Sequence, residues 1–270
     1  MKLKAIALDL DGTLLTSDKK ISETNREILK ELNRRGVKIF LVTGRTYLAT
    51  KPYALDLDAG GVVIAYNGAK VVDYESDRVI FELPLEEDHV KELIRISKRL
   101  GVPLNLYQNN KWYVEDSSRR EVIRYGSERD MIPIEKDFYD FDDYKMTKSV
   151  FLGTDEEPET LERVHREVQK ILGDKVYTAK STDILYEVLN REVNKGLVLK
   201  RVLKTYGISP EECVAFGDAT NDIEMLRAVK YGVAMGNATR EVKASVDYVT
   251  DTNDNNGVAK FLKKYFFDRD

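Results

Sequence analysis

The sequence predicts an α/β protein, built on a doubly wound parallel sheet with an inserted α+β domain. Short, fully apolar segments alternate with amphipathic helical segments in the first third of the chain and again in the last third. This alternation is typical of a parallel sheet covered by helices on both faces. In the middle of the chain, hairpin patterns replace it. With 270 residues, the chain is long enough for a core domain that carries a smaller one.

The first third is predicted to begin with a strand over residues 4–10 and to continue with helices and strands in turn. Ser22 can cap a helix that ends near Arg35, because apolar residues recur there at helical spacing. The other elements predicted here are strands at 37–42 and 61–65, a short helix after Arg45 between them, and a hairpin over 69–83. In a sheet of this kind, ligands bind at the carboxyl ends of the strands.

The last third repeats the alternation of strands and helices found in the first. It predicts a helix over 194–206, strands at 213–217 and 231–235, a helix from about residue 221 and a closing helix near 260–267. Between the two thirds we expect a helix over 86–100, a hairpin over 103–115, a strand at 147–153, a helix over 156–172 and paired strands around 176–179 and 184–189. We therefore predict a core of residues 1–83 and 190–270 and an inserted domain of residues 84–189.

Composition limits the classes of function. The net charge is -4 and the sequence pI about 5.5, without a basic patch, so we expect no binding to nucleic acid. No apolar run approaches the roughly 20 residues of a membrane helix, and the first residues do not resemble a signal peptide. Cys213 is the only cysteine, which excludes an internal disulfide. We expect a cytoplasmic protein that does not associate with membranes.

Asp9 and Asp11 stand at the end of the first predicted strand, inside the apolar stretch "IALDLDGTLL". On an extended backbone their side chains point to the same face, and burying an unpaired carboxylate is costly. A cation or a transferred proton is therefore the expected partner. Gly12 lets the backbone turn sharply and approach a ligand. An acidic turn is the alternative, and a calcium loop is disfavoured because "TLLTSDKK" lacks the further oxygen ligands.

Two more stretches place polar residues at the ends of predicted elements. One lies between a predicted strand and the next helix, and the other lies at the start of a helix. In "LVTGR", Thr43 offers a hydroxyl, and the backbone amides of Gly44 and Arg45 can receive an anion. In "NKG", Lys195 lies in the first turn of a helix, where the helix dipole mildly disfavours a cation. Taken alone, both stretches are also compatible with an ordinary strand exit and a surface lysine.

The stretch "FGDATND" places Asp218 at the end of a buried strand and Asp222 four residues later, in the first turn of the next helix. Capping of the helix accounts for one acid at this position. It does not account for the combination of both acids with Gly217 and Asn221.

In this combination and order, the four stretches resemble the motifs of the haloacid dehalogenase (HAD) superfamily of phosphohydrolases: DxDGT, a strand-end threonine or serine, a lysine, and GDxxND. The long insert is similar to the C2B cap of the Cof-type subfamily IIB. The segments "YNGA" at 66–69 and "TNDNNGVA" at 252–259 are similar to further signatures of that subfamily. The resemblance covers the whole chain, and it implies a Rossmann-like HAD core at 1–83 and 190–270 with a cap at 84–189.

The resemblance implies a magnesium-dependent phosphatase that acts on small phosphorylated metabolites, sugar phosphates above all, through an aspartyl-phosphate. Asp9 would be the nucleophile, and Asp11 would protonate the leaving oxygen and later activate water. Thr43 and Lys195 would stabilise the phosphoryl group. Mg²⁺ would be held by Asp9, Asp11, Asp218 and Asp222, and the substrate would be contacted by Thr43, Gly44, Arg45, Asn67, Lys195 and Asn221. For Arg45 and Asn67, a helix-start arginine and a turn asparagine remain the structural alternatives.

Other conspicuous residues are expected to be structural. Trp112 and Tyr107 are predicted to pack inside the inserted domain, and Cys213 to lie buried in a strand. His89 and His165 fall on amphipathic helices and are expected at the surface, with no zinc site.

Three alternatives to a phosphatase remain open from the sequence. A phosphomutase with a similar core would return the phosphoryl group to sugar rather than to water. A signalling receiver also uses a phosphorylated aspartate, but receivers lack the second acid of DxDGT and the large insert. A binding module without activity is the third. We expect a monomer or a small homo-oligomer.

Overall fold

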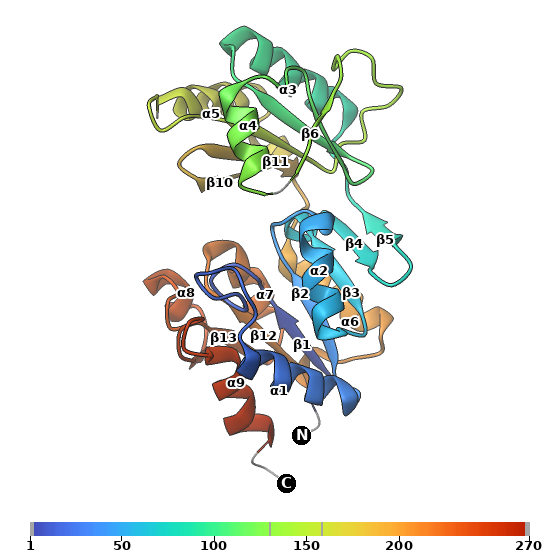
Figure 1. Ribbon diagram of the computed structural model, residues 1–270, viewed down its shortest axis with the longest axis vertical. Helices are drawn as coiled ribbons and strands as arrows, with labels where there is room; N and C mark the ends of the chain where they lie inside the picture. The colour runs from blue at the N-terminus through green and yellow to red at the C-terminus, as the bar shows by residue number, and fades with distance from the viewer. Residues whose placement is uncertain (1–2, 130, 158, 268–270) are drawn as a thin grey trace. The chain divides into compact units, whose positions relative to one another are not determined.

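The computed structural model describes residues 3–129, 131–157 and 159–267 (Figure 1). The remaining residues of the predicted core (1–2 and 268–270) and of the predicted insert (130 and 158) lie outside the described residues. The chain forms two compact units. The core unit comprises Met1–Phe81 and Asn194–Asp270, and the inserted unit comprises Glu82–Val193.

The inserted unit extends slightly beyond the predicted range of 84–189 at both ends. At its start, the Thr147 hydroxyl donates a hydrogen bond to the Glu82 carboxylate. At its end, the backbone N–H of Val193 donates to the carbonyl of Asn190 over 3.0 Å. These bonds tie both connecting segments to the inserted unit.

The core unit is built around an eight-stranded sheet with the strand order β14-β13-β12-β1-β2-β3-β4-β5. The strands are β1 (Ala5–Leu8), β2 (Lys38–Val42), β3 (Val62–Ala65), β4 (Lys70–Asp73), β5 (Arg78–Glu82), β12 (Cys213–Gly217), β13 (Tyr231–Ala234) and β14 (Tyr248–Val249). The strands from β14 to β3 are parallel, and β4 pairs antiparallel with β3. The predicted hairpin thus extends the sheet, which is mixed rather than parallel throughout.

Helices cover both faces of this sheet, as predicted for a doubly wound α/β fold (Figure 1). They are α1 (Glu23–Arg34), α2 (Tyr47–Leu57), α6 (Lys195–Thr205), α7 (Ile223–Arg227), α8 (Arg240–Ala244) and α9 (Gly257–Leu262). On one side of β1 the strands follow in the order β2, β3, and on its other side they follow in the order β12, β13, β14. Right-handed crossovers therefore put α1 and α2 on one face and α6 and α7 on the other. In agreement, α1 contacts α2 and α9, whereas α6 contacts α7.

Short helical turns complete the chain. They are the 3-10 turns η1 (Tyr66–Gly68), η2 (Gly173–Lys175), η3 (Pro210–Glu212) and η4 (Thr220–Asp222), and the π-helical turn η5 (Lys263–Phe267). The expected helix from residue 221 is therefore split into η4 and α7. The short elements α8, β14 and β8 (Ile134–Glu135) were not predicted, because two to five residues are too few to show a period.

The inserted unit contains a six-stranded sheet with the order β10-β11-β9-β6-β7-β8. Its other strands are β6 (Leu104–Gln108), β7 (Lys111–Val114), β9 (Lys148–Leu152), β10 (Val176–Thr182) and β11 (Leu185–Asn190), and its helices are α3 (Glu87–Leu100), α4 (Arg120–Ser127) and α5 (Glu159–Ile171). The hairpin predicted over 103–115 is formed by β6 and β7, and Asn109 and Asn110, both with positive φ, form the tight turn between them.

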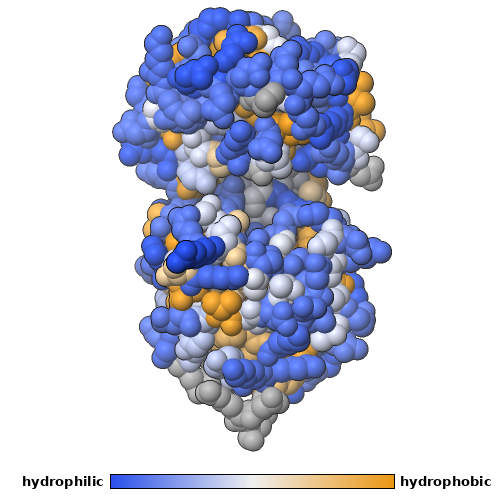
Figure 2. Space-filling model, turned by 90° about the vertical axis from the view of Figure 1, so that its left-hand side faces the viewer, coloured by the Kyte–Doolittle hydropathy of each residue, from blue (hydrophilic) through white to orange (hydrophobic). Residues whose placement is uncertain are grey.

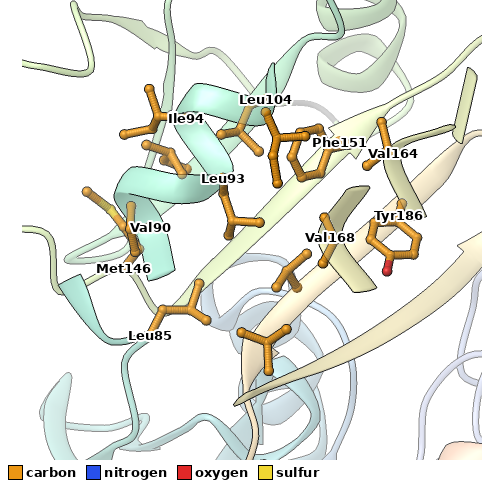
Figure 3. Close-up of a cluster of buried hydrophobic side chains, with 14 of the residues drawn as sticks. Leu85, Val90, Leu93, Ile94, Leu104, Met146, Phe151, Val164, Val168 and Tyr186 are labelled. Carbon is orange, nitrogen blue, oxygen red and sulfur yellow. The ribbon is translucent and has the colours of Figure 1, made fainter. Parts of the chain in front are cut away.

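A hydrophobic cluster packs between α3, α5 and one face of this second sheet (Figure 3). The cluster includes Leu93 and Ile94 from α3, Phe151 from β9 and Val164 from α5, and all four side chains are fully buried. This cluster explains the strong amphipathic pattern of both helices, and it leaves the other face of the sheet to different residues.

Charged and polar residues dominate the surface, and the hydrophobic residues on the face shown in Figure 2 form separate small patches. Trp112, Tyr107 and Cys213 are buried, as predicted. His165 is exposed, and His89 is half-buried. Among the described helices, none combines the length and the apolar character needed to cross a lipid bilayer.

Candidate active site

The polar residues that the sequence singled out lie in the core unit, at the carboxyl ends of neighbouring parallel strands. Asp9 follows β1, Thr43 follows β2 and Asp218 follows β12, with β1 between the other two strands. Because these strands are parallel, their carboxyl ends meet at one edge of the sheet. Hydrogen bonds then connect the predicted residues to one another.

Lys195 forms the centre of a buried ionic cluster. Its Nζ lies 2.8 Å from Asp9 Oδ1 and 2.6 Å from Asp222 Oδ1, and the three side chains are almost inaccessible to solvent. Asn194 caps α6, with its side chain accepting a bond from the N–H of Leu197. A β-carbon at Gly196 would lie 2.2 Å from the carbonyl oxygen of Glu224. Glycine therefore lets α6 approach α7 closely enough to bury its first lysine.

Asp222 has donors on both carboxylate oxygens. Oδ1 receives the Lys195 ammonium, and Oδ2 accepts the backbone N–H groups of Asp218 and Ala219, each over 3.0 Å. Gly217 makes room for it, since a β-carbon there would lie 2.5 Å from Cβ of Asp222. Asp222 therefore fixes the turn after β12 and the position of Lys195.

Asp218 is held by the loop that follows β1. The Thr13 hydroxyl donates to Asp218 Oδ1 over 2.7 Å. Gly12 has a positive φ of 78°, and a β-carbon on it would lie 2.4 Å from Asp218 Oδ2. The close approach that the sequence assigned to Gly12 is therefore an approach to this carboxylate.

Asp9, Asp218 and Asp222 offer carboxylate oxygens that all lie within 4.8 Å of one another. Burial, reinforced by the neighbouring carboxylates, raises the pKa of Asp9 to about 8, although Lys195 opposes this shift. Burial also raises the pKa of Asp218 to about 6. A hard divalent cation fits this donor set, because carboxylate oxygens are its preferred ligands and one ammonium cannot neutralise three acids.

The carboxylate of Asp11 is held by two basic side chains. Arg45 donates from Nε to Oδ2 over 2.6 Å and from Nη2 to Oδ1 over 2.7 Å, and Lys19 Nζ lies 2.8 Å from Oδ1. Burial acts to raise the pKa of Asp11, but the hydrogen bonds from Arg45 and Lys19 outweigh it and lower the pKa to about 2. Asp9 and Asp11 are thus separated by only one residue in the motif but have opposite electrostatic surroundings.

Thr43, Asn67 and Asn221 complete the network. Thr43 Oγ1 accepts the backbone N–H of Arg45 over 3.1 Å, and the Thr43 carbonyl accepts the N–H of Asn67 over 2.9 Å. Asn67 has a positive φ of 57° in η1, and its Oδ1 accepts a bond of 3.0 Å from Asn221 Nδ2. Gly44 lies against the same amide, since a β-carbon on it would be 3.0 Å from Asn67 Oδ1. All ten predicted residues are thus connected to one another, either through hydrogen bonds or because they are neighbours in the chain.

Sequence reasoning missed four residues that support this network. They are Thr13, Lys19, Asn237 and Asn253. Asn237 Nδ2 donates to the carbonyl of Gly12 over 2.7 Å, and Asn253 Nδ2 donates to the carbonyl of Leu15 over 2.9 Å. Thr13 lies in the stretch "IALDLDGTLL" and Asn253 in "TNDNNGVA", so both could have been identified from these stretches of the sequence. Lys19 and Asn237 carried no such signal.

A family model for haloacid dehalogenase-like hydrolases matches residues 6–262 of the chain. The chain belongs to this family. The structure of this chain is similar to a crystal structure of a haloacid dehalogenase-like hydrolase from Bacteroides thetaiotaomicron, with a TM-score of 0.90. It is 32% identical in sequence, and the match covers 98% of this chain and 100% of that one. The predicted fold class is thereby confirmed.

Two further relatives specify the kind of hydrolase. The structure of the HAD subclass IIB sugar phosphatase BT4131 matches with a TM-score of 0.82 and 25% identity, covering 97% of this chain and 98% of that one. The 5-amino-6-(5-phospho-D-ribitylamino)uracil phosphatase YcsE of Bacillus subtilis (strain 168) is 29% identical over 267 residues, which are 97% of this chain and 96% of that one. This haloacid dehalogenase-like hydrolase is a phosphatase of subfamily IIB.

Proposed function

We propose that the protein hydrolyses phosphomonoesters of small metabolites, sugar phosphates among them, with Mg²⁺ and through an aspartyl-phosphate. The observation that carries the proposal is the buried cluster in which Lys195 contacts both Asp9 and Asp222, with Asp218 beside them. Such a cluster is costly to bury unless it has a function, because three acids share one ammonium.

In the proposed reaction, a carboxylate oxygen of Asp9 attacks the phosphorus atom. A bond from Asp9 to phosphorus forms while the bond from phosphorus to the leaving oxygen breaks, and the leaving oxygen takes a proton. Water then attacks the aspartyl-phosphate, which restores Asp9 and releases inorganic phosphate. Lys195 lies against Asp9 and would offset negative charge as it develops on the phosphoryl group. Thr43 would donate a hydrogen bond from its hydroxyl group to a phosphoryl oxygen.

Asp11 is proposed to exchange protons with the leaving group and then with water. In the observed arrangement its two oxygens are bonded to Arg45 and Lys19, which keep it ionised. An ionised Asp11 can accept a proton from water in the second step. To donate a proton in the first step it has to leave these partners, and a substrate that binds Arg45 would release it.

Mg²⁺ would be held by the carboxylates of Asp9 and Asp218 and by the backbone carbonyl of Asp11. The oxygen donors and the room that Gly12 leaves beside Asp218 fit this ion. Because both oxygens of Asp222 already accept hydrogen bonds, we assign it to orienting Lys195 and the Asp218 turn. When bound, the ion supplies positive charge that polarises the phosphoryl group.

The substrate is proposed to be a small phosphorylated metabolite. A sugar phosphatase and a ribityl-phosphate phosphatase are both similar to this chain over nearly its full length, which supports this class. Arg45 and Asn67 are proposed to contact the substrate from the core unit, together with Gly44 and Asn221.

The experiment is hydrolysis of p-nitrophenyl phosphate by Asp9→Asn in the presence of Mg²⁺. We expect loss of turnover by several orders of magnitude, because the amide is not a nucleophile. Asp247→Asn is the control, since Asp247 is an exposed aspartate of the same unit. Turnover by Asp9→Asn at the wild-type rate would refute the assignment. Isomerised sugar phosphate in place of free phosphate would identify a mutase instead.

A further inference from the structure

One of the two cations on Asp11 comes from an exposed turn. Lys19 lies in the turn of residues 16–20, where its backbone N–H donates to the carbonyl of Thr16 over 2.8 Å. The Lys19 side chain is 59% exposed, although its Nζ lies 2.8 Å from Asp11 Oδ1. An exposed ion pair contributes little free energy, so it does not by itself fix a long and flexible side chain. The ammonium therefore stays on Asp11 only if the turn that carries it is held in place.

Two successive residues from the last part of the chain hold this turn. Both carboxylate oxygens of Asp254 accept hydrogen bonds from Ser17, one from its backbone N–H over 2.8 Å and one from its hydroxyl over 2.7 Å. These bonds keep the pKa of Asp254 below its usual range. Asn253 donates from Nδ2 to the carbonyl of Leu15 over 2.9 Å. The segment "TNDNNGVA" thus binds the chain directly before Lys19, although Asp254 and Ser17 are 237 residues apart in sequence.

Residues 252–257, which we call the anchor loop, are fixed by further bonds. The carbonyl of the first residue of the loop accepts the N–H of its last residue over 3.0 Å. The backbone N–H of Asn253 donates to Asn237 Oδ1 over 3.0 Å, and Asn237 Nδ2 donates to the carbonyl of Gly12 over 2.7 Å. The anchor loop is therefore an ordered base that holds the segment after β1 at more than one point.

Lys19 and Arg45 contact the carboxylate of Asp11 differently. Arg45 contacts both oxygens, whereas Lys19 contacts Oδ1 alone. In the proposed reaction, a substrate that binds Arg45 releases Asp11 from this partner. Lys19 then keeps Oδ1 in place and leaves Oδ2 available to give a proton to the leaving oxygen. The orientation of Asp11 during this proton transfer would therefore depend on the position of the 16–20 turn.

We propose that Asp254 is a positioning residue for the phosphatase reaction. It acts through Ser17 on the 16–20 turn and thereby sets the ammonium of Lys19 against Asp11. Among the described residues, the Asp254 carboxylate bonds only to Ser17, so its effect reaches Asp11 through the turn. The inference rests on the proposed function, because it requires that Asp11 gives a proton to the leaving oxygen. A bond that merely joins two surface loops is the alternative.

The test compares phenyl phosphate with p-nitrophenyl phosphate as substrates of the full-length protein in the presence of Mg²⁺. Phenolate is more basic than p-nitrophenolate, so its departure depends more strongly on a proton from Asp11. The measured quantity is kcat/KM, which reports the loss of transition-state stabilisation relative to free enzyme and substrate. The variants are Asp254→Ala, Lys19→Ala and the double variant.

Asp251→Ala is the matched control. Asp251 directly precedes the anchor loop and also carries a carboxylate that accepts several hydrogen bonds. Its partners are Lys260, Asn255 and the backbone N–H of Thr252, all close to it in the chain. The control therefore disturbs the same region without releasing the 16–20 turn.

We expect Asp254→Ala and Lys19→Ala each to lower kcat/KM for phenyl phosphate about tenfold and to leave p-nitrophenyl phosphate within about twofold. The double variant should be no slower than Lys19→Ala, because both changes remove the same contact. Asp251→Ala should keep the wild-type ratio of the two substrates. Ser17→Ala retains the backbone bond to Asp254, so it should lower kcat/KM for phenyl phosphate only about threefold, and it serves if Asp254→Ala does not fold.

The inference is overturned if Asp254→Ala leaves the ratio of the two kcat/KM values unchanged. It is also overturned if the double variant loses about a hundredfold, the product of two independent effects. An equal change in Asp251→Ala would contradict it as well, because the anchor loop as a whole would then matter. Failure of the proposed function gives different results. The wild type would then hydrolyse neither phosphate with Mg²⁺, or Asp11→Asn would keep the wild-type kcat/KM for phenyl phosphate.

Discussion

Substituting Gly12 by alanine tests whether the turn after β1 positions Asp218. The backbone at Gly12 has φ of 78°, where an L-residue costs about 1–2 kcal/mol. A β-carbon there would also lie 2.4 Å from Asp218 Oδ2, whereas ordinary contacts begin at 3.4 Å. The carboxylate therefore has to move by about 1 Å, which can reduce catalysis about 10²-fold.

Gly36 supplies the matched control. Its φ is 88°, close to that of Gly12, but a β-carbon there would meet nothing within 4 Å. Gly36→Ala should therefore lower the free energy of unfolding only by the backbone cost of about 1–2 kcal/mol. The lower conformational entropy of the variant's unfolded chain offsets part of this loss. The difference between the two variants isolates the contact with Asp218.

The assay has two parts, unfolding in urea and hydrolysis of p-nitrophenyl phosphate at several Mg²⁺ concentrations. We expect Gly36→Ala to lose stability and keep the wild-type kcat, and Gly12→Ala to lose both. Gly12→Ala should also need more Mg²⁺ for half-maximal rate, because Asp218 is displaced. Equal kcat for the two variants would refute the reasoning, whether both were active or both inactive.

Three further predictions concern the same cluster. Lys195→Met should lower the free energy of unfolding of the metal-free protein by about 3–5 kcal/mol in urea, because it leaves buried carboxylates without their cation; an unchanged midpoint would contradict this. Mg²⁺ affinity should rise as the pH increases from 6 to 8, because Asp218 and Asp9, with pKa raised to about 6 and 8, must lose their protons before they bind. Calorimetry in buffers of different ionisation enthalpy should detect the released protons, and their absence would argue against it. Asn237→Ala removes the bond to the Gly12 carbonyl and should lower kcat up to tenfold with a stability loss of about 1 kcal/mol, so unchanged kcat would leave Asn237 without a positioning role.

The sequence was sufficient to predict the strands and the acids at their ends. β1 and β12 carry no charged residue, and the change to acidic residues marks the point where these two strands reach the edge of the sheet. Parallel pairing then brings Asp9 and Asp218 together without further information. The helices that show a clear amphipathic period, such as α1 and α3, were also predictable.

The burial of Lys195 could not be predicted from its own surroundings in the sequence. Its local pattern is that of a helix-start lysine, normally at the surface, and its two partners lie 186 and 27 residues away. The same applies to Lys19, whose backbone is in the left-handed region with φ of 59°. That conformation turns the loop back towards Asp11, and no side-chain periodicity reports it.

The charges of the site explain why a divalent cation and a phosphate suit it together. Asp9, Asp218 and Asp222 with Lys195 carry three negative charges and one positive charge when all are ionised, which leaves a deficit of two positive charges. A monovalent cation would correct only half of this deficit in a buried place, where uncompensated charge is expensive. Two residues from Asp9 in the chain, Asp11 has two cationic partners and therefore belongs to a group with excess positive charge. A phosphomonoester brings the negative charge that this second group lacks. The two acids of the opening motif thus belong to two neighbouring groups of opposite net charge. The divalent cation neutralises the acidic group around Asp9, and the phosphate of the substrate neutralises the basic group around Asp11.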